Sequence, residues 1–500
     1  MSAPSCISRT VLSSLVLAHL ALGHPHHGDG GNSEAPIDTI LWLHILIQLV
    51  VWGGIFGVGM VLGITRSKWH VPVQSAAYLM TAAGYILGHS HKGRSFPESA
   101  HGTTANLILI PLLTQLCLGI YLKLHIHEET IRPWAVVAHG IIGKSWLVIG
   151  WVQMLFGVIV ARGYCGKEGL GQCLAHYIMG SAFIGYGVLL AIVLIAGGGR
   201  VWYGKRWRDG NKGEKVVSPR SQEWWDGWVI MLWGIVNTFT EHHGPLTKWS
   251  HKDMQHTTLG VIWWAGGAVA IFLARKGKRT VIPALIIIVT GWAMSSHSQA
   301  MEISTKVHAV FGVVLMSAGV ARIIEITFVL KDAASIADGD VARSENNREV
   351  EVQAFQHLPP FLLVAGGVLF MSATDEELKA VMGIEMDHVT YILLMFSLAF
   401  VIYLYANLLL YLYATTGRNA KGKAAPSTAG YTPLRVNSTL AAGAALTPTT
   451  AFTPAPAYPG GPMGHDEENV YKISDGRDSF EEELELDEVR GGESGRLALR

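Results

Sequence analysis

Residues 39–64 read TILWLHILIQLVVWGGIFGVGMVLGI, an apolar run without Asp, Glu, Lys or Arg. A helix needs about 17–25 predominantly apolar residues to cross the hydrocarbon core of a bilayer. The run is therefore predicted to be a membrane-spanning helix. Ten further segments are predicted to span the bilayer: 71–89, 103–123, 133–160, 173–198, 224–240, 257–273, 281–297, 307–330, 358–374 and 389–413.

The composition of the whole chain agrees with this prediction. Only 15% of the 500 residues are charged, whereas a soluble domain carries about 25% charged residues. So few charges cannot form a water-exposed surface, which excludes a soluble enzyme and a disordered protein. The 38 basic and 38 acidic residues cancel, which argues against nucleic acid as a partner. We predict an all-α fold, a multi-pass transmembrane bundle of about eleven spans with the lipid bilayer as its partner.

The loop charges and the first residues predict the orientation of the chain. Residues 1–23 resemble a secretory signal peptide that ends at Ala21-Leu22-Gly23; the alternative is a short disordered N-terminus. With an exoplasmic N-terminus, the inner loops hold 18 Lys and Arg and the outer loops hold eight. Because basic residues favour the cytosolic side, the C-terminus is predicted to be cytosolic, at the plasma membrane or an endomembrane.

One outer loop contains two cysteines, Cys165 and Cys173. An exoplasmic loop is oxidising enough for a disulfide bond between them. Two unpaired thiols are the alternative, since the sequence does not give their geometry.

Composition also divides the chain. A basic loop at 200–223 separates a five-span half, residues 37–199, from a six-span half, residues 224–413. The tail 414–500 is rich in Pro, Thr, Ala and Gly and then becomes acidic. Such a composition predicts a disordered tail, on the cytosolic side in this topology.

The first four predicted spans each offer one histidine. His44 and His101 lie near the outer ends of their spans, and His70 and His139 lie near the inner ends. Ionisable residues within spans are functional candidates by default, and a b-type haem takes two axial imidazoles from facing helices. The positions therefore predict two haem b groups. The alternative is four interfacial histidines that hydrogen-bond across helices.

Histidines also gather at the outer ends of four consecutive spans in the second half. Neutral imidazole is the commonest metal ligand, and such a cluster suits Zn, Cu or Fe, or a third haem. Ordinary interface histidines are the alternative. The predicted metal ligands are His242, His256, His297 and His308. On the ninth span, Arg322 and Glu325 are three residues apart and are predicted to pair.

The first half carries a recognisable series of motifs: Leu43-His44 to Gly63, Trp69-His70-Val-Pro-Val-Gln to Gly88, His101-Gly to Gly119, and Arg132-Pro-Trp to His139-Gly140. Residues 40–160 thereby resemble the four-helix haem core of cytochrome b561 and ferric-reductase-type domains. The resemblance implies that His44 pairs with His101 and that His70 pairs with His139. It also implies electron transfer across the bilayer to an acceptor such as ferric iron.

A second series of motifs extends through the other half: Trp224-Trp-Asp226, Gly234-Ile-Val-Asn237-Thr-Phe-Thr-Glu241-His242, Trp263-Trp-Ala-Gly266-Gly267, His297-Ser-Gln299 and Arg322-Ile-Ile-Glu325. With the first half, these motifs resemble the fungal Ytp-like integral membrane family over nearly all of residues 37–413. This resemblance implies a multi-pass membrane protein and assigns no chemistry to it.

Two functions of different classes follow. The first is a haem-dependent transmembrane oxidoreductase with an exoplasmic histidine cluster. The second is a non-haem protein that binds or transports a metal ion. A third possibility is a multi-spanning protein whose histidines only sense exoplasmic pH. The sequence names no electron donor, acceptor or oligomeric state.

Overall fold

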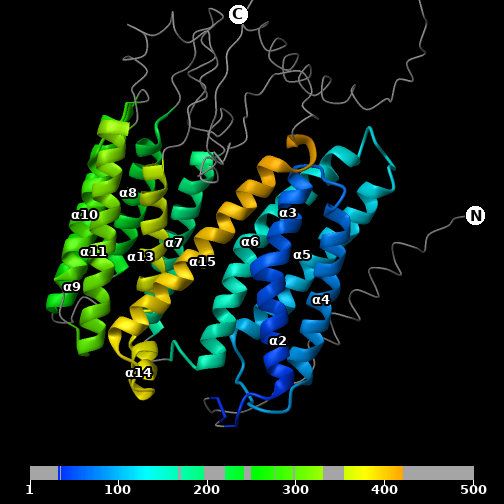
Figure 1. Ribbon diagram of the computed structural model, residues 1–500, viewed down its shortest axis with the longest axis horizontal. Coiled ribbons are helices and arrows are strands. Elements are labelled where there is room, and N and C mark those ends of the chain that lie inside the picture. Colours follow the sequence, from blue (N-terminus) through cyan, green and yellow to red (C-terminus); the bar gives the residue numbers. More distant parts are fainter. Residues whose placement is uncertain are drawn as a thin grey trace, which may run out of the picture. The chain divides into compact units, whose positions relative to one another are not determined.

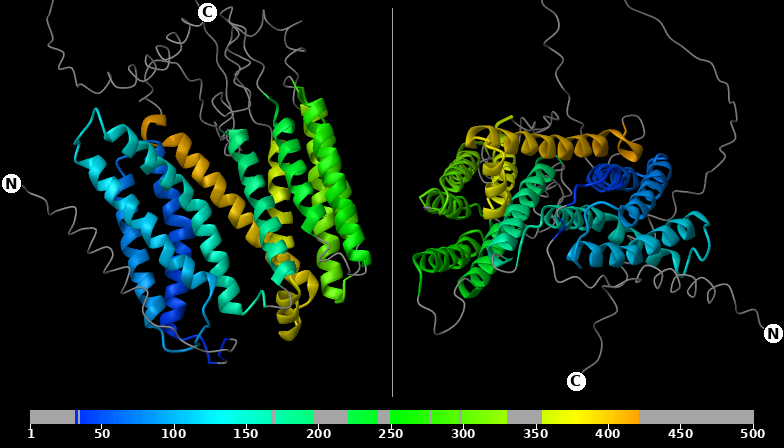
Figure 2. Two further views of the ribbon diagram at one scale, coloured as in Figure 1. Left: turned by 180° about the vertical axis from the view of Figure 1, so that it is seen from behind. Right: turned by 90° about the horizontal axis from the view of Figure 1, so that it is seen from below.

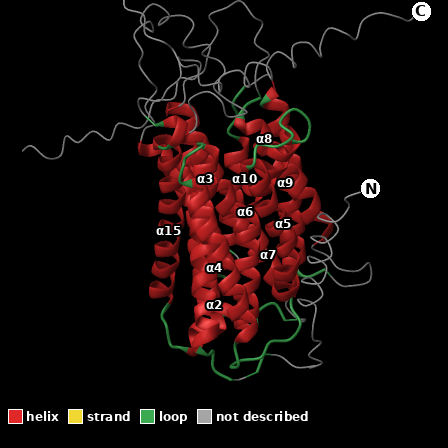
Figure 3. Ribbon diagram, turned by 90° about the vertical axis from the view of Figure 1, so that its right-hand side faces the viewer, coloured by secondary structure: helices red, strands yellow, loops and turns green. Residues whose placement is uncertain are grey.

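The computed structural model describes residues 32–33, 35–166, 170–195, 220–240, 249–275, 278–296, 299–329 and 354–420. The predicted signal peptide, residues 200–219 of the basic loop and the tail from residue 421 lie outside the described residues. Every regular element within the described ranges is a helix (Figure 3). This confirms the predicted all-α fold class.

Each predicted span coincides with a helix or a chain of consecutive helices. The first half contains α2 (Thr39–Val50), η1 (Val51–Ile55), α3 (Phe56–Ile64), α4 (His70–Ser90), α5 (Ala100–Lys123), α6 (Arg132–Arg162) and α7 (Leu170–Ile195). The second half contains α8 (Gln222–Thr240), α9 (His251–Leu273), α10 (Ile282–Ser295), α11 (Glu302–Ile324), η4 (Glu325–Val329), η5 (Ala354–His357), α13 (Leu358–Met371), α14 (Asp375–Gly383), α15 (His388–Thr415) and η6 (Gly417–Asn419).

Eight of the helical segments in the described residues are long and apolar enough to cross a membrane. The others among the predicted spans are α4, α8 and α10. The first two are less apolar, and α10 has only 14 residues. Each of the three packs against a qualifying helix: α4 against α2 and α3, α8 against α9, and α10 against α11.

The first four spans pack as antiparallel neighbours, α2–α3 with α4 and α5 with α6 (Figure 1). Their interior is filled by a buried cluster that includes Val51, Phe56 and Trp146. The end at which α2 and α5 begin is named the disulfide end, because the bonded pair Cys165–Cys173 follows α6 there. At this end Arg94 donates hydrogen bonds to the carbonyls of Ala35 and Ala161.

Glycines bring the helices of the second half into backbone contact. A Cβ atom on Gly180 of α7 would lie 2.7 Å from the carbonyl oxygen of Gly367 on α13. Gly234 of α8 and Gly291 of α10 meet the backbones of α9 and α11 equally closely. Small residues at such positions let membrane helices approach without side chains between them.

Helix α15 joins these parts of the fold, since it contacts α3, α7, α11 and α13 (Figures 1 and 2). The Tyr405 hydroxyl on α15 donates a 2.5 Å hydrogen bond to the carbonyl of Gly54. Near the other end of the same helix pair, the hydroxyls of Thr65 and Thr416 are 3.1 Å apart. The last span thus packs against the first.

Candidate functional site

The structure brings together the histidines of both predicted haem pairs. The ring centres of His44 on α2 and His101 on α5 are 6.2 Å apart, with ring planes at 85°. His70 on α4 and His139 on α6 have nearly the same geometry, with ring centres 6.3 Å apart and planes at 87°. The first pair lies toward the disulfide end and the second toward the opposite end. The role of these residues as haem ligands stays a prediction.

Backbone carbonyls hold three of the four rings. The Nδ1 atom of His44 lies 2.7 Å from the carbonyl oxygen of Gly84, and that of His70 lies 2.8 Å from that of Gly59. The Nδ1 atom of His101 lies 3.2 Å from a backbone carbonyl on α6. When Nδ1 donates to a carbonyl, Nε2 keeps its lone pair for a metal. His139 differs, because its Nδ1 is buried without a partner.

A glycine from a further helix faces each ring. A Cβ atom on Gly88 would lie 2.6 Å from the His44 ring, and one on Gly157 would lie 3.2 Å from the His101 ring. Toward the opposite end, a Cβ atom on Gly63 would lie 2.8 Å from the His70 ring, and one on Gly119 would lie 3.5 Å from the His139 ring. Each pair therefore forms a layer in which two helices supply histidines and the other two supply glycines.

The first two spans also share an internal repeat. Each contains a histidine in its first part, followed four residues later by a glutamine, and two glycines four residues apart near its end. Because the helices are antiparallel, the glycines of each receive the histidine and glutamine of the other. The members are His44, Gln48, Gly59 and Gly63 in the first span, and His70, Gln74, Gly84 and Gly88 in the second.

The two copies of the repeat differ by one residue. The separation of Gln48 from Gly59 exceeds that of Gln74 from Gly84 by one position. The first span contains the π-helical turn η1 within this interval, and a π-turn holds one more residue than an α-turn. The π-turn therefore keeps both ends of the first span facing α4.

Aromatic side chains fill the interval between the two histidine layers. The ring centres of Trp52 and Trp146 are 5.4 Å apart, and those of Trp52 and Phe56 are 4.7 Å apart. Tyr78 on α4 extends this group, at 5.7 Å from Phe56. Trp146 and Phe56 are almost completely buried. The middle of the first half is thus a packed aromatic core.

A capping carboxylate fixes the start of α2, six residues before His44. Asp38 accepts hydrogen bonds from the backbone N–H groups of Lys92 and Leu41, at 3.0 and 2.9 Å. These donors, Lys92 first, lower the pKa of the Asp38 carboxyl. The ionised side chain therefore ties the first helix to the loop that follows α4.

In the second half, the predicted metal ligands are only partly described. His242 and His297 lie outside the described residues. His308 on α11 is 3% exposed and faces His176 on α7, with ring centres 5.9 Å apart and planes at 88°. His256 on α9 is close enough to interact electrostatically with His176. His176 is not among the metal ligands predicted from sequence; its position three residues after Cys173 was the available signal.

At the opposite end of the second half, buried charges form a network around Arg322. As predicted, Arg322 pairs with Glu325, at 2.5 Å. It also contacts Glu223 of α8 at 2.9 Å, and Glu223 is 1% exposed. Tyr186 of α7 donates a 2.5 Å hydrogen bond to Asp226. The network links α7, α8 and α11, and removing one partner of such a buried ion pair is strongly destabilising.

Comparisons with known proteins match both halves of the chain. Residues 149–414 match the family described as "Protein YTP1-like, C-terminal", and residues 27–125 match a domain of unknown function (DUF2427). Protein YTP1 of Saccharomyces cerevisiae is 43% identical over 275 residues, which is 54% of each chain. The matched region thus spans about half the length of that relative.

Two further relatives are named as uncharacterized membrane proteins. One, from Schizosaccharomyces pombe, is 22% identical over 73% of this chain and 92% of its own length. The other, from Saccharomyces cerevisiae, is 25% identical over 41% of this chain and 37% of its own length. No solved structure matches. These findings support the Ytp-like resemblance, while the likeness to cytochrome b561 stays a prediction.

Proposed function

Because this chain belongs to the YTP1-like family of multi-pass membrane proteins, we propose that its first four spans carry electrons across the bilayer through two haem b groups. One observation carries the proposal: two layers of the same design, each with a facing pair of imidazoles. The layers lie toward opposite ends of the same four spans. This is the arrangement that transfer from one face of a membrane to the other requires.

The spacing of the rings fits a metal between them. A ring nitrogen lies about 1.1 Å from the centre of its imidazole, and a metal–imidazole bond is about 2.0 Å long. Two imidazoles on opposite sides of one metal therefore have centres about 6.2 Å apart. The observed separations are 6.2 and 6.3 Å. Four histidines that only bridged helices by hydrogen bonds would not need this spacing twice.

The surrounding residues fit a large planar group as well. In each layer, the two helices without histidines present glycines, so no Cβ atom fills the space beside the rings. The side-chain oxygens of Gln48, Gln74 and Gln115 are buried there without hydrogen-bond partners. Buried polar atoms are normally satisfied, so these oxygens are consistent with a further group in the layers.

In this proposal the protein positions the histidine ligands and adjusts the basicity of their ring nitrogens. The haem supplies the one-electron chemistry when it is bound. The carbonyls of Gly84 and Gly59 hold the rings of His44 and His70 and raise the basicity of their free nitrogens. Along α2–α3 the layers are roughly 20–30 Å apart, from the helical rise per residue. The aromatic group around Trp52 and Phe56 occupies that interval and excludes water from it.

We further propose that the disulfide end is exoplasmic. The bond between Cys165 and Cys173 needs an oxidising compartment, and the basic loops predict a cytosolic location for the opposite end. The electron donor would then act near His70 and His139. The acceptor, a metal ion such as ferric iron, would act near His44 and His101.

The test is the difference spectrum, reduced minus oxidised, of the purified full-length protein, together with its haem content. We expect about two haems b per chain. The His101→Ala and His70→Ala variants should each lose one of the two, and the haem that remains reports that the variant is folded. His89→Ala, which removes an exposed imidazole at the end of α4, is the control and should keep both. Folded wild-type protein without a b-type haem band would refute the proposal.

A second candidate function is binding of a metal ion by the second half. The observation that favours it is the facing pair His176 and His308. Of the four ligands predicted from sequence, His308 belongs to this pair and His256 lies near it.

A further inference from the structure

A third pair of facing histidines lies near the disulfide end of the second half. The Nδ1 atom of His176 lies 2.8 Å from the carbonyl oxygen of Gln172, and that of His308 lies 2.8 Å from that of Ser304. Each ring is thus held by its own helix. The Nε2 atom of His176 is buried without a partner, and His176 itself is only 7% exposed. A buried ring nitrogen of this kind points to a missing ligand.

The packing around this pair excludes a haem. The Phe370 ring is stacked on His176, with centres 4.6 Å apart and planes at 16°. Phe311 packs on Phe370 at 4.8 Å, and Val307 is completely buried beside His308. Among the described glycines, none faces either ring in the way that Gly88 faces His44. The space between the two imidazoles therefore suits a single ion.

The side chains around the pair favour some metal ions over others. Within the described residues, no third His, Cys, Asp or Glu completes a metal-binding group, whereas zinc takes four ligands. Monovalent copper accepts imidazole and also thioether sulfur. Five partly buried methionines, Met179, Met294, Met301, Met371 and Met386, pack against the buried core that contains Val307 and Phe370. Two imidazoles, with thioether sulfurs in the surrounding core, suit monovalent copper better than an ion that needs four ligands.

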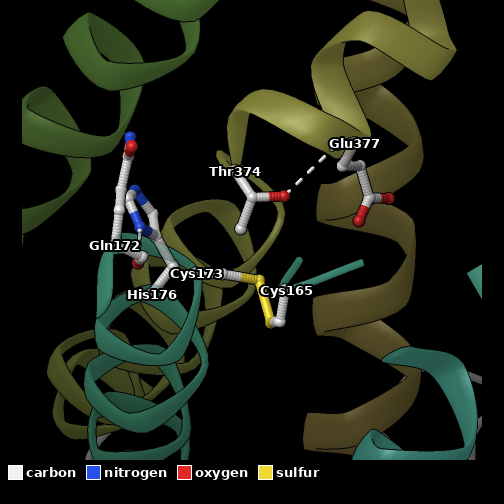
Figure 4. The surroundings of a disulfide bond; sticks show 6 residues. All are labelled: Cys165, Gln172, Cys173, His176, Thr374 and Glu377. Atoms are coloured by element: carbon white, nitrogen blue, oxygen red, sulfur yellow. Dashed lines mark hydrogen bonds between the residues drawn. A yellow bond between two sulfur atoms is a disulfide. The ribbon is translucent and has the colours of Figure 1, made fainter. Parts of the chain in front are cut away.

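Two features beside the pair favour a rigid binding site for a cation. The disulfide Cys165–Cys173 fixes the first turn of α7, three residues before His176 (Figure 4). Asp375, at the start of α14, lies within electrostatic range of His176 and offers a compensating negative charge. Figure 4 shows the neighbouring residue Thr374 accepting the backbone hydrogen bond of Glu377, which caps α14.

We propose that His176 and His308 bind one monovalent copper ion at the disulfide end, separately from the histidine layers of the first half. The site differs from the predicted four-histidine cluster because its second imidazole comes from α7. The proposal deepens the second candidate function and does not depend on haem. In the proposed orientation the site is exoplasmic.

The experiment is a titration of the purified full-length protein, kept reduced with ascorbate, with monovalent copper in competition with a chromogenic copper(I) chelator. His176→Gln and His308→Gln should each weaken copper binding at least tenfold. His89→Gln, at the same end and exposed, is the matched control and should bind like wild type. In X-ray absorption spectra of the wild-type complex, two imidazole ligands are expected, and one in each variant.

Haem content, measured on the same samples, separates this proposal from the first, because both variants should keep the haem content of wild type. If a variant fails to fold, the thermal unfolding midpoint of the wild-type protein is measured with and without copper instead. Copper is expected to raise this midpoint. Unchanged copper affinity in both folded variants would overturn the proposal. So would a wild type that binds zinc but not monovalent copper.

Discussion

At the scale of the residue, glycine has different neighbours in the two halves. Gly234 and Gly291 face backbone atoms of the next helix, where a side chain would push the helices apart. Gly63 and Gly88 face imidazole rings instead. In the first half, then, glycine makes room for a specific side chain, and its replacement should disturb that side chain first.

This difference predicts the effect of Gly88→Ala. The added Cβ would lie 2.6 Å from the His44 ring, so the ring must move and the histidine pair at the disulfide end should be disrupted. The control is Gly54→Ala, whose Cβ has nothing within 4 Å and which should stabilise the helix by up to about 1 kcal/mol. Thermal unfolding and haem content would be measured for both. Equal behaviour of the two variants would contradict this account of the layers.

At the scale of the element, η1 is the feature that distinguishes the first span from the second. It compensates for one additional residue, so that His44 and Gly63 both face α4. It also presents the Gly54 carbonyl to Tyr405 of α15. The turn therefore serves both the histidine layers and the attachment of the last span.

Removing one residue from the turn is the direct test. Deletion of Gly53 should convert η1 into an α-helical turn and keep the repeat aligned, because α4 has the same spacing without a π-turn. Deletion of Ala82, an exposed residue of α4, should rotate Gly84 and Gly88 by about 100° away from α2. We expect the Ala82 deletion to lower the thermal unfolding midpoint several times more than the Gly53 deletion does. A similar loss in both would show that the turn has another role.

At the scale of the whole molecule, the orientation in the membrane can be tested from both ends. After mild reduction in sealed, right-side-out membranes, a membrane-impermeant maleimide should label Cys165, which is partly exposed, whereas Cys173 is 2% exposed. The sequence Asn437-Ser-Thr fits a glycosylation site, and in a cytosolic tail it should stay unmodified. Glycan at Asn437, or a Cys165 thiol protected from the reagent, would invert the proposed topology.

The fold was predictable from sequence to the extent that hydropathy determines it. The span 39–64 has the predicted bounds because no polar residue interrupts its ends. Helix α9 begins at His251, earlier than the predicted residue 257, because Ser250 and Asp253 form a capping box that extends a polar first turn. Polar helix starts of this kind are invisible to hydropathy.

The site was predictable only where partners are close in sequence. His44, His70, His101 and His139 lie on four consecutive spans, where position gave their depth and the resemblance to cytochrome b561 implied their pairing. His176 was missed because α7 packs against α13, and α13 against α11. That packing places His176 beside His308, and no local pattern in the sequence specifies it.

The two-layer design of the first half has a consequence for biosynthesis. Neither histidine pair lies within one hairpin: His44 and His70 belong to the first, and His101 and His139 to the second. A nascent chain that has inserted only α2 to α4 therefore holds two unmatched imidazoles at different depths. If the first four spans bind haem as proposed, its capture must wait until the second hairpin has been inserted, so loading would report that these spans have assembled in the correct order.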